Sequence, residues 1–576
     1  MKDITFCVGG PAGQGIKTVG FNFGKVMLRL GYYVHDNDEY PSLIKGGHNV
    51  LWARAADEKI HSHDSKTHIL LALDKNTVRK YQDQMESGGV IIVDEKKIKL
   101  KDEDKTREDL HYISLPLFKT AVEVAGNAIM FNTVGLAAAF AMLGVDIEIY
   151  KQVLADQFAS KGADIVSGNQ AAAQAGYDLG KKFKPHKDWD FPAQERGDDK
   201  AYFLTGNQAI TYGAVAAGCK LLCSYPMTPA SSVMEFFGDL ENSHNVVLKH
   251  VEDEIAALNM TTGAWHAGAR AMVATSGGGF VLMAEALGFA AISEAGPVIF
   301  IAMRPGPATG VPTFTGQADL RFVLHAGQDE FPRIILAPGD NEECFYLMQE
   351  AFNLGDVYQT PVIVLSDKFL AESHFTTPAL DDQRVPIKKG KVTFDQLPED
   401  YVRYQVDVKD GVSTRAIPGT KGGCFLANSY EHDEHGFATE EADMVLKQRD
   451  KRHQKIAAIA SELPMPALIG PEKAGLTLVT WGSTKMVARE AMRALESEGV
   501  SVNILHFSCL FPLDWEKLKN ELAKYPKTLF IEGNGEGQFQ GILKQYTDFV
   551  PTDAYHRIDG RPFYPEELVE KVREML

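Results

Sequence analysis

Thr228 lies between two prolines in the run Tyr225-Pro226-Met227-Thr228-Pro229, directly after the apolar stretch 221–224. Proline fixes its own backbone φ angle, so a hydroxyl between two prolines is presented from a stiff loop. Loops at the carboxyl ends of parallel strands are the usual ligand sites of α/β sheets. The pattern indicates a hydroxyl placed to hydrogen-bond a small polar ligand, although a purely structural strand-to-helix turn has the same composition.

Glu254 begins a second segment that could do chemistry. It ends the acidic run Glu252-Asp253-Glu254 and precedes small residues, at 256–264, that let a ligand approach a helix closely. A glutamate at a helix start often serves only as a partner of the helix dipole. A positioned carboxylate is also a common proton-transfer group, and Glu252 and Asp253 compete with Glu254 for that role.

Two glycine-rich turns follow two further apolar stretches. The first contains Ser276 and Gly277, and the second runs from Arg304 to Thr313. Glycines let backbone amide groups approach a ligand, although tight turns also require them. Together with the Thr228 loop and the Glu254 segment, these turns make four loops on one edge of one sheet. They predict a single site around Thr228.

Strands that alternate with helices must position these loops. Continuous apolar strands are buried on both faces, which predicts parallel sheets covered by helices, and the fold class is α/β with three domains. The expected divisions are 1–183, a linker at 184–200, 201–375, a crossover at 376–465, and 466–576. The expected strands are 4–8, 32–35, 69–73, 90–93, 203–205, 221–224, 246–249, 271–275, 298–303, 334–337, 362–366, 476–481, 502–506 and 528–532.

The composition excludes several classes of function. The 576 residues carry a formal net charge of −18, which disfavours binding to nucleic acid or to an anionic membrane. No apolar run is long enough to span a membrane, and Met1-Lys2-Asp3 leads straight into a strand, so we expect a cytoplasmic protein without a signal peptide. The six cysteines include no Cys-x-x-Cys pair, which is the usual spacing of iron–sulfur ligands. We predict no metal ligands in this chain.

Taken in order, these motifs resemble the α subunit of 2-oxoacid:ferredoxin oxidoreductases over nearly the whole chain. The matching segments are 225–229, 252–257, 274–279 and 306–313, with 410–419 and 431–436 in the crossover and 532–538 and 560–563 in a domain similar to the C-terminal domain of transketolase. Segments 9–15 and 40–47 resemble the γ domain of the family, here fused to the front of α. Each segment alone is weak, and the joint match is specific.

The resemblance implies a thiamine diphosphate enzyme that acts on a 2-oxo acid. It makes Glu254 the residue that activates the aminopyrimidine ring and Thr228 the partner of the substrate. Ser276 and Gly277 are then expected at the cofactor. The expected substrate-binding residues are Tyr225, Pro226, Thr228, Pro229, Arg304, Thr313 and Phe314. Lys45 and Arg54 are expected near coenzyme A, because the γ domain lies near it in relatives.

The resemblance also implies partners. The Gly-Asp-Gly motif that usually anchors the diphosphate through Mg²⁺ does not occur in this sequence. A β subunit would supply that site and a [4Fe–4S] cluster, in an (αβ)₂ heterotetramer that passes electrons to ferredoxin. The fused architecture is more similar to 2-oxoglutarate enzymes, which act in acyl-CoA formation or in CO₂ fixation through the reductive tricarboxylic acid cycle.

Alternative substrates and functions stay open at this point. Many relatives have an arginine where this chain has Phe314, so a clamp for a distal carboxylate does not transfer directly, and Arg304 and Arg321 are the nearby substitutes. Pyruvate or a branched 2-oxo acid is the alternative substrate. A nicotinamide or flavin oxidoreductase is a further alternative, since Asp36 and Asp38 follow the glycines at 9–15, but the order of glycines differs from the dinucleotide fingerprint. A self-contained thiamine enzyme and a non-catalytic scaffold are the remaining alternatives.

Overall fold

The structure is a computed structural model that describes residues 2–43, 46–183, 186, 189–196 and 200–576. The chain forms two compact units. The first unit comprises 1–204, 373–379 and 564–566, and the second comprises 205–372, 380–563 and 567–576. No helix among the described residues is both long and apolar enough to cross a membrane.

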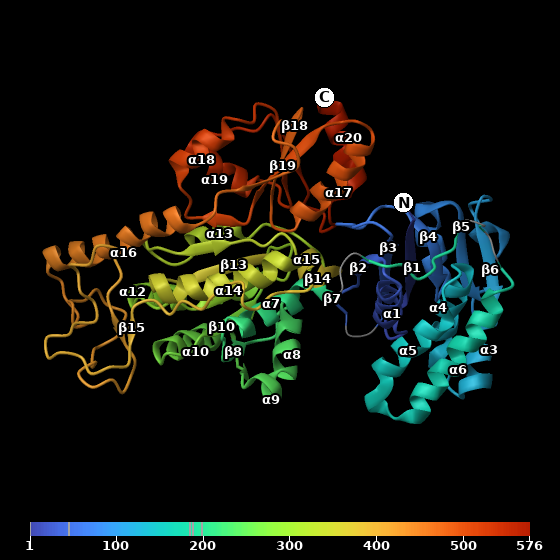
Figure 1. The fold of residues 1–576 in the computed structure, drawn as a ribbon, viewed down its shortest axis with the longest axis horizontal. Coiled ribbons are helices and arrows are strands. Elements are labelled where there is room, and N and C mark those ends of the chain that lie inside the picture. Colours follow the sequence, from blue (N-terminus) through green and yellow to red (C-terminus); the bar gives the residue numbers. More distant parts are fainter. Residues whose placement is uncertain (1, 44–45, 184–185, 187–188, 197–199) are drawn as a thin grey trace. The chain divides into compact units, whose positions relative to one another are not determined.

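The first unit is built on an eight-stranded sheet with strand order β6-β5-β4-β1-β3-β2-β14-β7, in which β1 to β6 are drawn in blue in Figure 1. Its strands are β1 (Asp3–Pro11), β2 (Tyr33–Glu39), β3 (His48–Ala56), β4 (Thr67–Ala72), β5 (Met85–Asp94), β6 (His111–Leu115), β7 (Ala201–Thr205) and β14 (His374–Pro378). Its helices are α1 (Ile16–Arg29), α2 (Lys75–Tyr81), α3 (Leu117–Ala125), α4 (Phe131–Met142), α5 (Ile147–Phe158) and α6 (Ala163–Gly180). The pairs β1–β4, β4–β5 and β5–β6 are parallel, whereas β3 pairs antiparallel with both β1 and β2.

Burial on both faces of this sheet explains the continuous apolar runs at 69–73 and 90–93. Successive side chains of a strand point to opposite faces. Accordingly, Phe6 and Val8 pack with α1 and α4 in one core, whereas Cys7 packs with α2 in another. Every residue of α4 is buried, which accounts for its lack of a polar face. The strands predicted in the first block are confirmed by β1, β2, β4 and β5.

Two strands join this sheet from distant parts of the sequence. The strand predicted at 203–205 exists as β7, but it lies at the edge of the first unit's sheet and not in the sheet of the second unit. Next to it, β14 pairs antiparallel with β2, and the carboxylate of Asp36 accepts hydrogen bonds from the backbone N–H of His374 (2.7 Å) and the ring Nδ1 (2.8 Å). The chain therefore returns to its first unit where the sequence indicated the start of the crossover.

The second unit contains two sheets. The larger has strand order β20-β12-β13-β11-β10-β8-β9 and is parallel except for β20. Its strands are β8 (Leu221–Ser224), β9 (Val247–His250), β10 (Ala271–Thr275), β11 (Val298–Met303), β12 (Ile334–Leu336), β13 (Val362–Asp367) and β20 (Cys509–Phe511). Helices around it are α7 (Gly206–Ala216), α8 (Ser231–Asp239), α9 (Glu241–His244), α10 (Glu254–His266), α11 (Gly277–Leu282), α12 (Ala284–Ile292), α13 (Leu320–His325), α14 (Asn341–Tyr358) and α15 (Lys368–Glu372). The predicted parallel sheet is confirmed, and β10, β11 and β13 are buried throughout.

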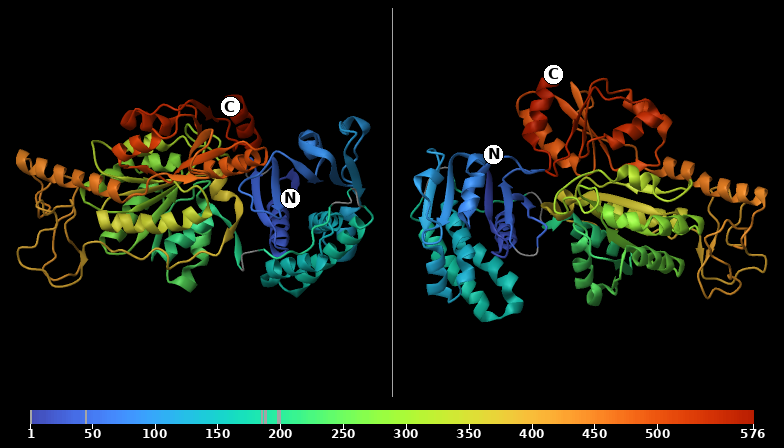
Figure 2. Two further views of the ribbon diagram at one scale, coloured as in Figure 1. Left: turned by 45° about the horizontal axis from the view of Figure 1, so that its top comes forward. Right: turned by 180° about the vertical axis from the view of Figure 1, so that it is seen from behind.

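The smaller sheet belongs to the C-terminal domain, drawn in orange to red in Figure 2, and has strand order β17-β19-β18-β21-β22. Its strands are β17 (Ala467–Ile469), β18 (Leu476–Trp481), β19 (Val502–Phe507), β21 (Thr528–Glu532) and β22 (Asp553–His556). Its helices are α17 (Thr484–Ser497), α18 (Trp515–Leu522), α19 (Gln538–Thr547) and α20 (Pro565–Met575). All three strands predicted here are confirmed.

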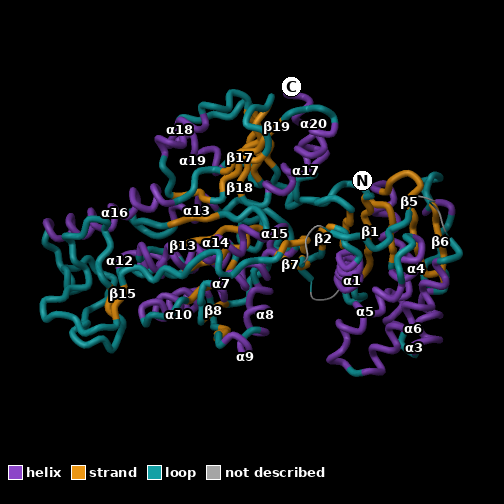
Figure 3. The backbone as a smooth tube through the Cα atoms, in the orientation of Figure 1, coloured by secondary structure: helices purple, strands orange, loops and turns teal. Residues whose placement is uncertain are grey.

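The crossover consists largely of loops, as the teal tube of Figure 3 shows, with the short strands β15 (Val392–Thr393) and β16 (Arg415–Ala416) and the long helix α16 (Ala442–Glu462). A buried ion cluster fixes it to the larger sheet's layer of helices. The Glu294 carboxylate accepts hydrogen bonds from Lys451 (2.5 Å) and Lys455 (2.7 Å), and all three side chains are buried. Burial acts to raise the pKa of Glu294, but the charges of Lys451, Lys455 and Arg403 outweigh it and hold that pKa well below its usual range.

Candidate active site

The loop that contains Thr228 follows β8, and side chains from two other segments hold its backbone. Arg304 Nη1 donates a hydrogen bond to the Thr228 carbonyl (2.7 Å), and Asn207 Nδ2 donates to the Pro229 carbonyl (2.8 Å). Tyr225 and Pro226 are exposed, while Pro229 is buried beneath them. The backbone of the loop is thereby fixed, and the outward side chains are left to meet a ligand.

Glu254 is the first residue of α10 and is distinguished by the fold from its two acidic neighbours. Asp253 caps the helix, since its carboxylate accepts a hydrogen bond from the backbone N–H of Ala256 (2.8 Å). Glu252 is exposed. Glu254 is 3% exposed, and its Oε1 has no hydrogen-bond partner in the described part of the chain. Among the three candidates, Glu254 alone presents a buried and unsatisfied carboxylate oxygen.

The glycine-rich turn after β10 lies against this carboxylate. A Cβ atom at Gly279 would lie 2.6 Å from Glu254 Oε1 and would overlap Thr275 Oγ1, so the position requires glycine. Ser276 is fully buried at the N-terminus of α11, and its Oγ also lacks a partner among the residues described. Gly277 lies against the carboxylate of Asp319. The structure thus brings Glu254, Ser276 and Gly277 together.

These atoms fit an aminopyrimidine ring. Buried polar atoms are almost always hydrogen-bonded, so an unpartnered one indicates a missing ligand. The ring of thiamine carries nitrogen donors and acceptors that Glu254 Oε1 and Ser276 Oγ can satisfy, and Gly279 keeps the carboxylate accessible. The residues present are therefore suited to hold the cofactor's pyrimidine end. Their individual roles stay predictions.

The loop after β11 surrounds a hollow of about 530 Å³. Its wall includes Pro305, Gly306 and Asp319 on one side and the C-terminal domain's Asn534 and Glu536 on the other. Thr313 is buried within this loop. The ring of Phe314 packs on the C-terminal domain, where the guanidinium carbon of Arg561 lies 4.2 Å from its centroid.

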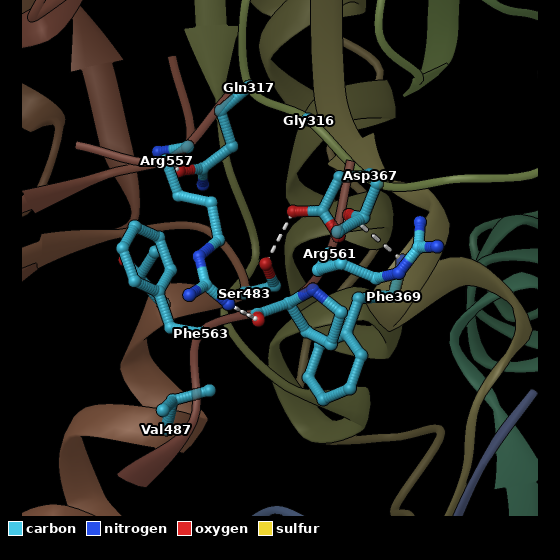
Figure 4. A pocket seen from close by; sticks show the side chains of 13 residues that line it. Gly316, Gln317, Asp367, Phe369, Ser483, Val487, Arg557, Arg561 and Phe563 are labelled. Carbon is cyan, nitrogen blue, oxygen red and sulfur yellow. Dashed lines mark hydrogen bonds between the residues drawn. The ribbon is translucent and has the colours of Figure 1, made fainter. Parts of the chain in front are cut away.

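A row of hydrogen bonds fixes this loop to the C-terminal domain. Gln317 Nε2 donates to the Trp481 carbonyl (3.0 Å), and its Oε1 accepts from the backbone N–H of Gly533 (2.8 Å). Asn534 Nδ2 donates to the Gln317 carbonyl (2.9 Å). Figure 4 shows a smaller pocket beside this contact, in which Ser483 donates to Asp367 Oδ2 (2.5 Å). The motif at 532–538 therefore positions the loop that follows β11.

The sequence analysis did not single out Asp319, Gln317 or Asp367. Only the spacing of Gln317 and Asp319 after the turn could have drawn attention to them, because their partners come from distant segments. Lys45, predicted near coenzyme A, lies outside the described residues. Arg54 is buried, with its Nε donating to Asp3 Oδ1 (3.0 Å) and its Nη1 to the Ser62 carbonyl (2.9 Å). In the described part of the chain, no group of three His, Cys, Asp or Glu side chains could hold a metal ion.

Three family models match this chain. Residues 212–451 match the family model of the thiamine diphosphate-binding domain of pyruvate flavodoxin/ferredoxin oxidoreductases, 5–179 match that of pyruvate ferredoxin/flavodoxin oxidoreductase, and 467–562 match the C-terminal domain of transketolase. The fold and the site therefore define a thiamine diphosphate-binding protein.

Similar full-length proteins define the family. A 2-oxoacid:ferredoxin oxidoreductase α subunit of Aeropyrum pernix is 32% identical over 100% of this chain and 98% of the relative. The 2-oxoglutarate oxidoreductase subunit KorA of Mycobacterium tuberculosis is 27% identical over 100% of this chain and 92% of that protein. The solved 2-oxoglutarate:ferredoxin oxidoreductase of Magnetococcus marinus, with 2-oxoglutarate, coenzyme A and succinyl-CoA bound, has a TM-score of 0.92 and 30% identity, with both chains fully covered. The chain belongs to the α subunits of 2-oxoacid:ferredoxin oxidoreductases.

Proposed function

We propose that this chain is the α subunit of an enzyme that oxidatively decarboxylates 2-oxoglutarate with coenzyme A to give succinyl-CoA and CO₂, and that the reaction can run in reverse to fix CO₂. The observation that carries the proposal is the buried, unpartnered Oε1 of Glu254, at the start of the helix that follows β9, while the fixed Thr228 loop follows the neighbouring strand β8. Bound thiamine diphosphate would supply the carbon nucleophile and accept the electrons released by decarboxylation.

The chain's own residues have defined tasks in this reaction. With the cofactor bound, the buried Glu254 carboxylate would hold the aminopyrimidine ring and serve as its proton-transfer partner, shielded from water. The hydroxyl of Thr228 donates a hydrogen bond to the carboxylate of the 2-oxo acid. Arg304 keeps the Thr228 backbone in place through the carbonyl. Ser276 Oγ and the Gly277 backbone contact the cofactor, and Tyr225 and Pro226 form the outer wall.

Support for 2-oxoglutarate comes from relatives. The Magnetococcus marinus enzyme, similar over its full length, was solved with 2-oxoglutarate and succinyl-CoA, and the Mycobacterium tuberculosis relative is named for 2-oxoglutarate. Coenzyme A in that structure also supports its use as co-substrate here. The family resemblance implies an arginine in many relatives where this chain has Phe314, so pyruvate and branched 2-oxo acids are the substrates to compare.

We further propose a β subunit that holds the diphosphate, Mg²⁺ and a [4Fe–4S] cluster and passes electrons to ferredoxin, in an (αβ)₂ assembly. The α-subunit names of the relatives support a multi-subunit enzyme. We keep Lys45 as a predicted neighbour of coenzyme A. Arg54 is a poor candidate, because its guanidinium is already bound to Asp3 and Ser62.

The test is to purify the chain with the partner that it retains and to measure viologen reduction with coenzyme A and 2-oxoglutarate, pyruvate or a branched 2-oxo acid. We expect the highest kcat/KM with 2-oxoglutarate. Glu254→Gln should lower turnover at least about 100-fold, the scale of a lost proton-transfer group. The matched control is Glu252→Gln, two residues away and exposed, which should retain full turnover. An active, colourless single chain would refute the two-subunit proposal, and an unimpaired Glu254→Gln variant would refute the assigned role.

A further inference from the structure

Asp367 is a buried acid at the carboxyl end of β13, on the edge of the parallel sheet from which the Thr228 loop also leaves. It is 1% exposed, yet the groups that hydrogen-bond to its carboxylate are hydroxyls and backbone N–H groups rather than cations. Burial raises the pKa of this carboxyl, and the hydrogen bonds act to lower it. A carboxylate that is costly to bury and is held by neutral groups indicates a role beyond packing.

The loop that follows β11 begins and ends beside this carboxylate. In the parallel pairing of β11 with β13, Met303 lies opposite Asp367, so the loop leaves the sheet next to it. At the far end of the loop, Thr315 Oγ1 donates a hydrogen bond to Asp367 Oδ1 (3.1 Å). The same hydroxyl accepts a hydrogen bond from the backbone N–H of Phe369 (3.2 Å). Residues 304–315 therefore form a closed loop whose two ends meet at the end of β13.

The carboxylate of Asp367 also binds two other segments. Ser483, between β18 and α17, donates a hydrogen bond to Oδ2 (2.5 Å), as Figure 4 shows. The backbone N–H of Leu370, in α15, donates to Oδ1 (3.2 Å). One side chain therefore fixes the loop that follows β11 to both the parallel sheet and the C-terminal domain.

The closed loop carries residues that are proposed to bind the substrate. Arg304 at its start donates a hydrogen bond to the Thr228 carbonyl (2.7 Å). Thr313 and Phe314 lie near its end, directly before Thr315. Because these two residues share a stretch of backbone with Thr315, loss of the anchor at Thr315 would shift both of them.

We propose that Asp367 is a positioning residue that closes the loop at 304–315 through Thr315 and so fixes the residues that bind the 2-oxo acid. The carboxylate acts as a hydrogen-bond acceptor and takes no part in proton transfer. The inference rests on the proposed function for the identity of the ligand, whereas the closure of the loop does not depend on it.

The test compares three variants of the complete complex. Thr315→Val removes the hydroxyl that closes the loop and should raise KM for the 2-oxo acid about tenfold, the effect of losing one hydrogen bond, while kcat and KM for coenzyme A stay within about twofold. Asp367→Ala should raise this KM at least as far. Asp367→Asn should stay within about twofold of the wild type, because the amide oxygen can accept from Thr315 and the amide nitrogen can donate to Ser483. The matched control is Thr360→Val, just before β13, where a buried hydroxyl donates to the Pro332 carbonyl (2.6 Å) and its loss should lower the melting temperature without changing KM.

The outcomes separate a positioning role from simple stabilisation of the fold. An unchanged KM in Thr315→Val, with a melting temperature lowered as in the control, would overturn the proposal. So would an Asp367→Asn variant as impaired as Asp367→Ala, because the charge and not the hydrogen bonding would then matter. If Asp367→Ala does not fold, the comparison of Thr315→Val with Thr360→Val decides the question.

A second measurement does not depend on turnover. Two backbone amides within the loop donate local hydrogen bonds, Val311 to the Pro305 carbonyl (3.0 Å) and Phe314 to the Val311 carbonyl (3.2 Å). Their hydrogen exchange should accelerate in Thr315→Val and stay unchanged in Thr360→Val. If the wild-type complex turns over no 2-oxo acid while these amides respond, the proposed function fails and the positioning of the loop stands. Exchange that does not change in Thr315→Val refutes the positioning role whatever the activity.

Discussion

Gly279→Ala should disable the active site without unfolding the protein. The added Cβ atom would lie 2.6 Å from Glu254 Oε1, whereas ordinary contacts begin at 3.4 Å, so the carboxylate must move by about 0.8 Å. Thr275 lies on the other side of the added Cβ atom and is fully buried, so its side chain has little room to move away instead. Misplacement of a catalytic group by about 1 Å can cost on the order of 100-fold in rate. We therefore expect kcat/KM for the 2-oxo acid to fall by about 30- to 100-fold, equivalent to about 2–3 kcal/mol of transition-state stabilisation.

The assay is viologen reduction by the complete complex, with a thermal melt of the same samples. The control is Gly288→Ala, a helical glycine of α12 whose added Cβ would meet nothing nearer than Gln328 Oε1 at 3.8 Å. Alanine has a better helix propensity, so this variant should melt at the same temperature or slightly higher and keep its activity. Full activity of Gly279→Ala would show that the position of the Glu254 carboxylate does not limit the reaction.

Three further predictions concern stability. Glu294→Gln leaves two buried lysines without their counter-charge and should lower the free energy of unfolding by about 3–5 kcal/mol. Lys451→Met should lower it less, because Lys455 still pairs with Glu294. Urea unfolding of both variants checks this order. The pKa of Glu294 is depressed in the folded state. The stability that this carboxylate contributes is therefore fully present above the unfolded-state pKa of about 4.3, and it is lost as the pH falls through the folded-state pKa. Glu294→Gln should therefore flatten the loss of stability below about pH 5, which melts across that range would detect. Gln317→Ala removes the hydrogen bond accepted from the Gly533 amide and one of the two hydrogen bonds to the Trp481 carbonyl, to which Thr484 also donates, and should cost about 2 kcal/mol. Faster hydrogen exchange at 532–538 is the measurement.

The sequence was sufficient for the parts of the site that lie within one strand and its following loop. An apolar strand followed by the Thr228 loop, or directly by Ser276, predicts both the element and the edge of the sheet where the loop lies. The choice among three consecutive acids required the fold. Asp253 and Glu254 differ only in whether the side chain caps the helix or turns inward, and that depends on where α10 begins.

The parts that could not be predicted depend on contacts between distant segments. The apolar residues of β7 predicted a strand, but they did not predict which sheet the strand joins. The sequence of a short edge strand does not indicate which strand it pairs with. Gln317 is an ordinary polar residue in sequence. Its role comes from a hydrogen bond to Gly533, more than 200 residues away.

The hydrogen bonding of the site shows why these distant contacts matter for its chemistry. A carboxylate oxygen of Glu254 and the hydroxyl of Ser276 are buried without partners, and each such atom costs on the order of 1–3 kcal/mol. Loops on their own would relax to satisfy these atoms. They are prevented because Arg304 holds the Thr228 backbone and Gln317 anchors the following loop to the C-terminal domain. We therefore expect the transketolase-like domain to support the site indirectly, by keeping the loops of the parallel sheet in a conformation that leaves these atoms for a bound ligand.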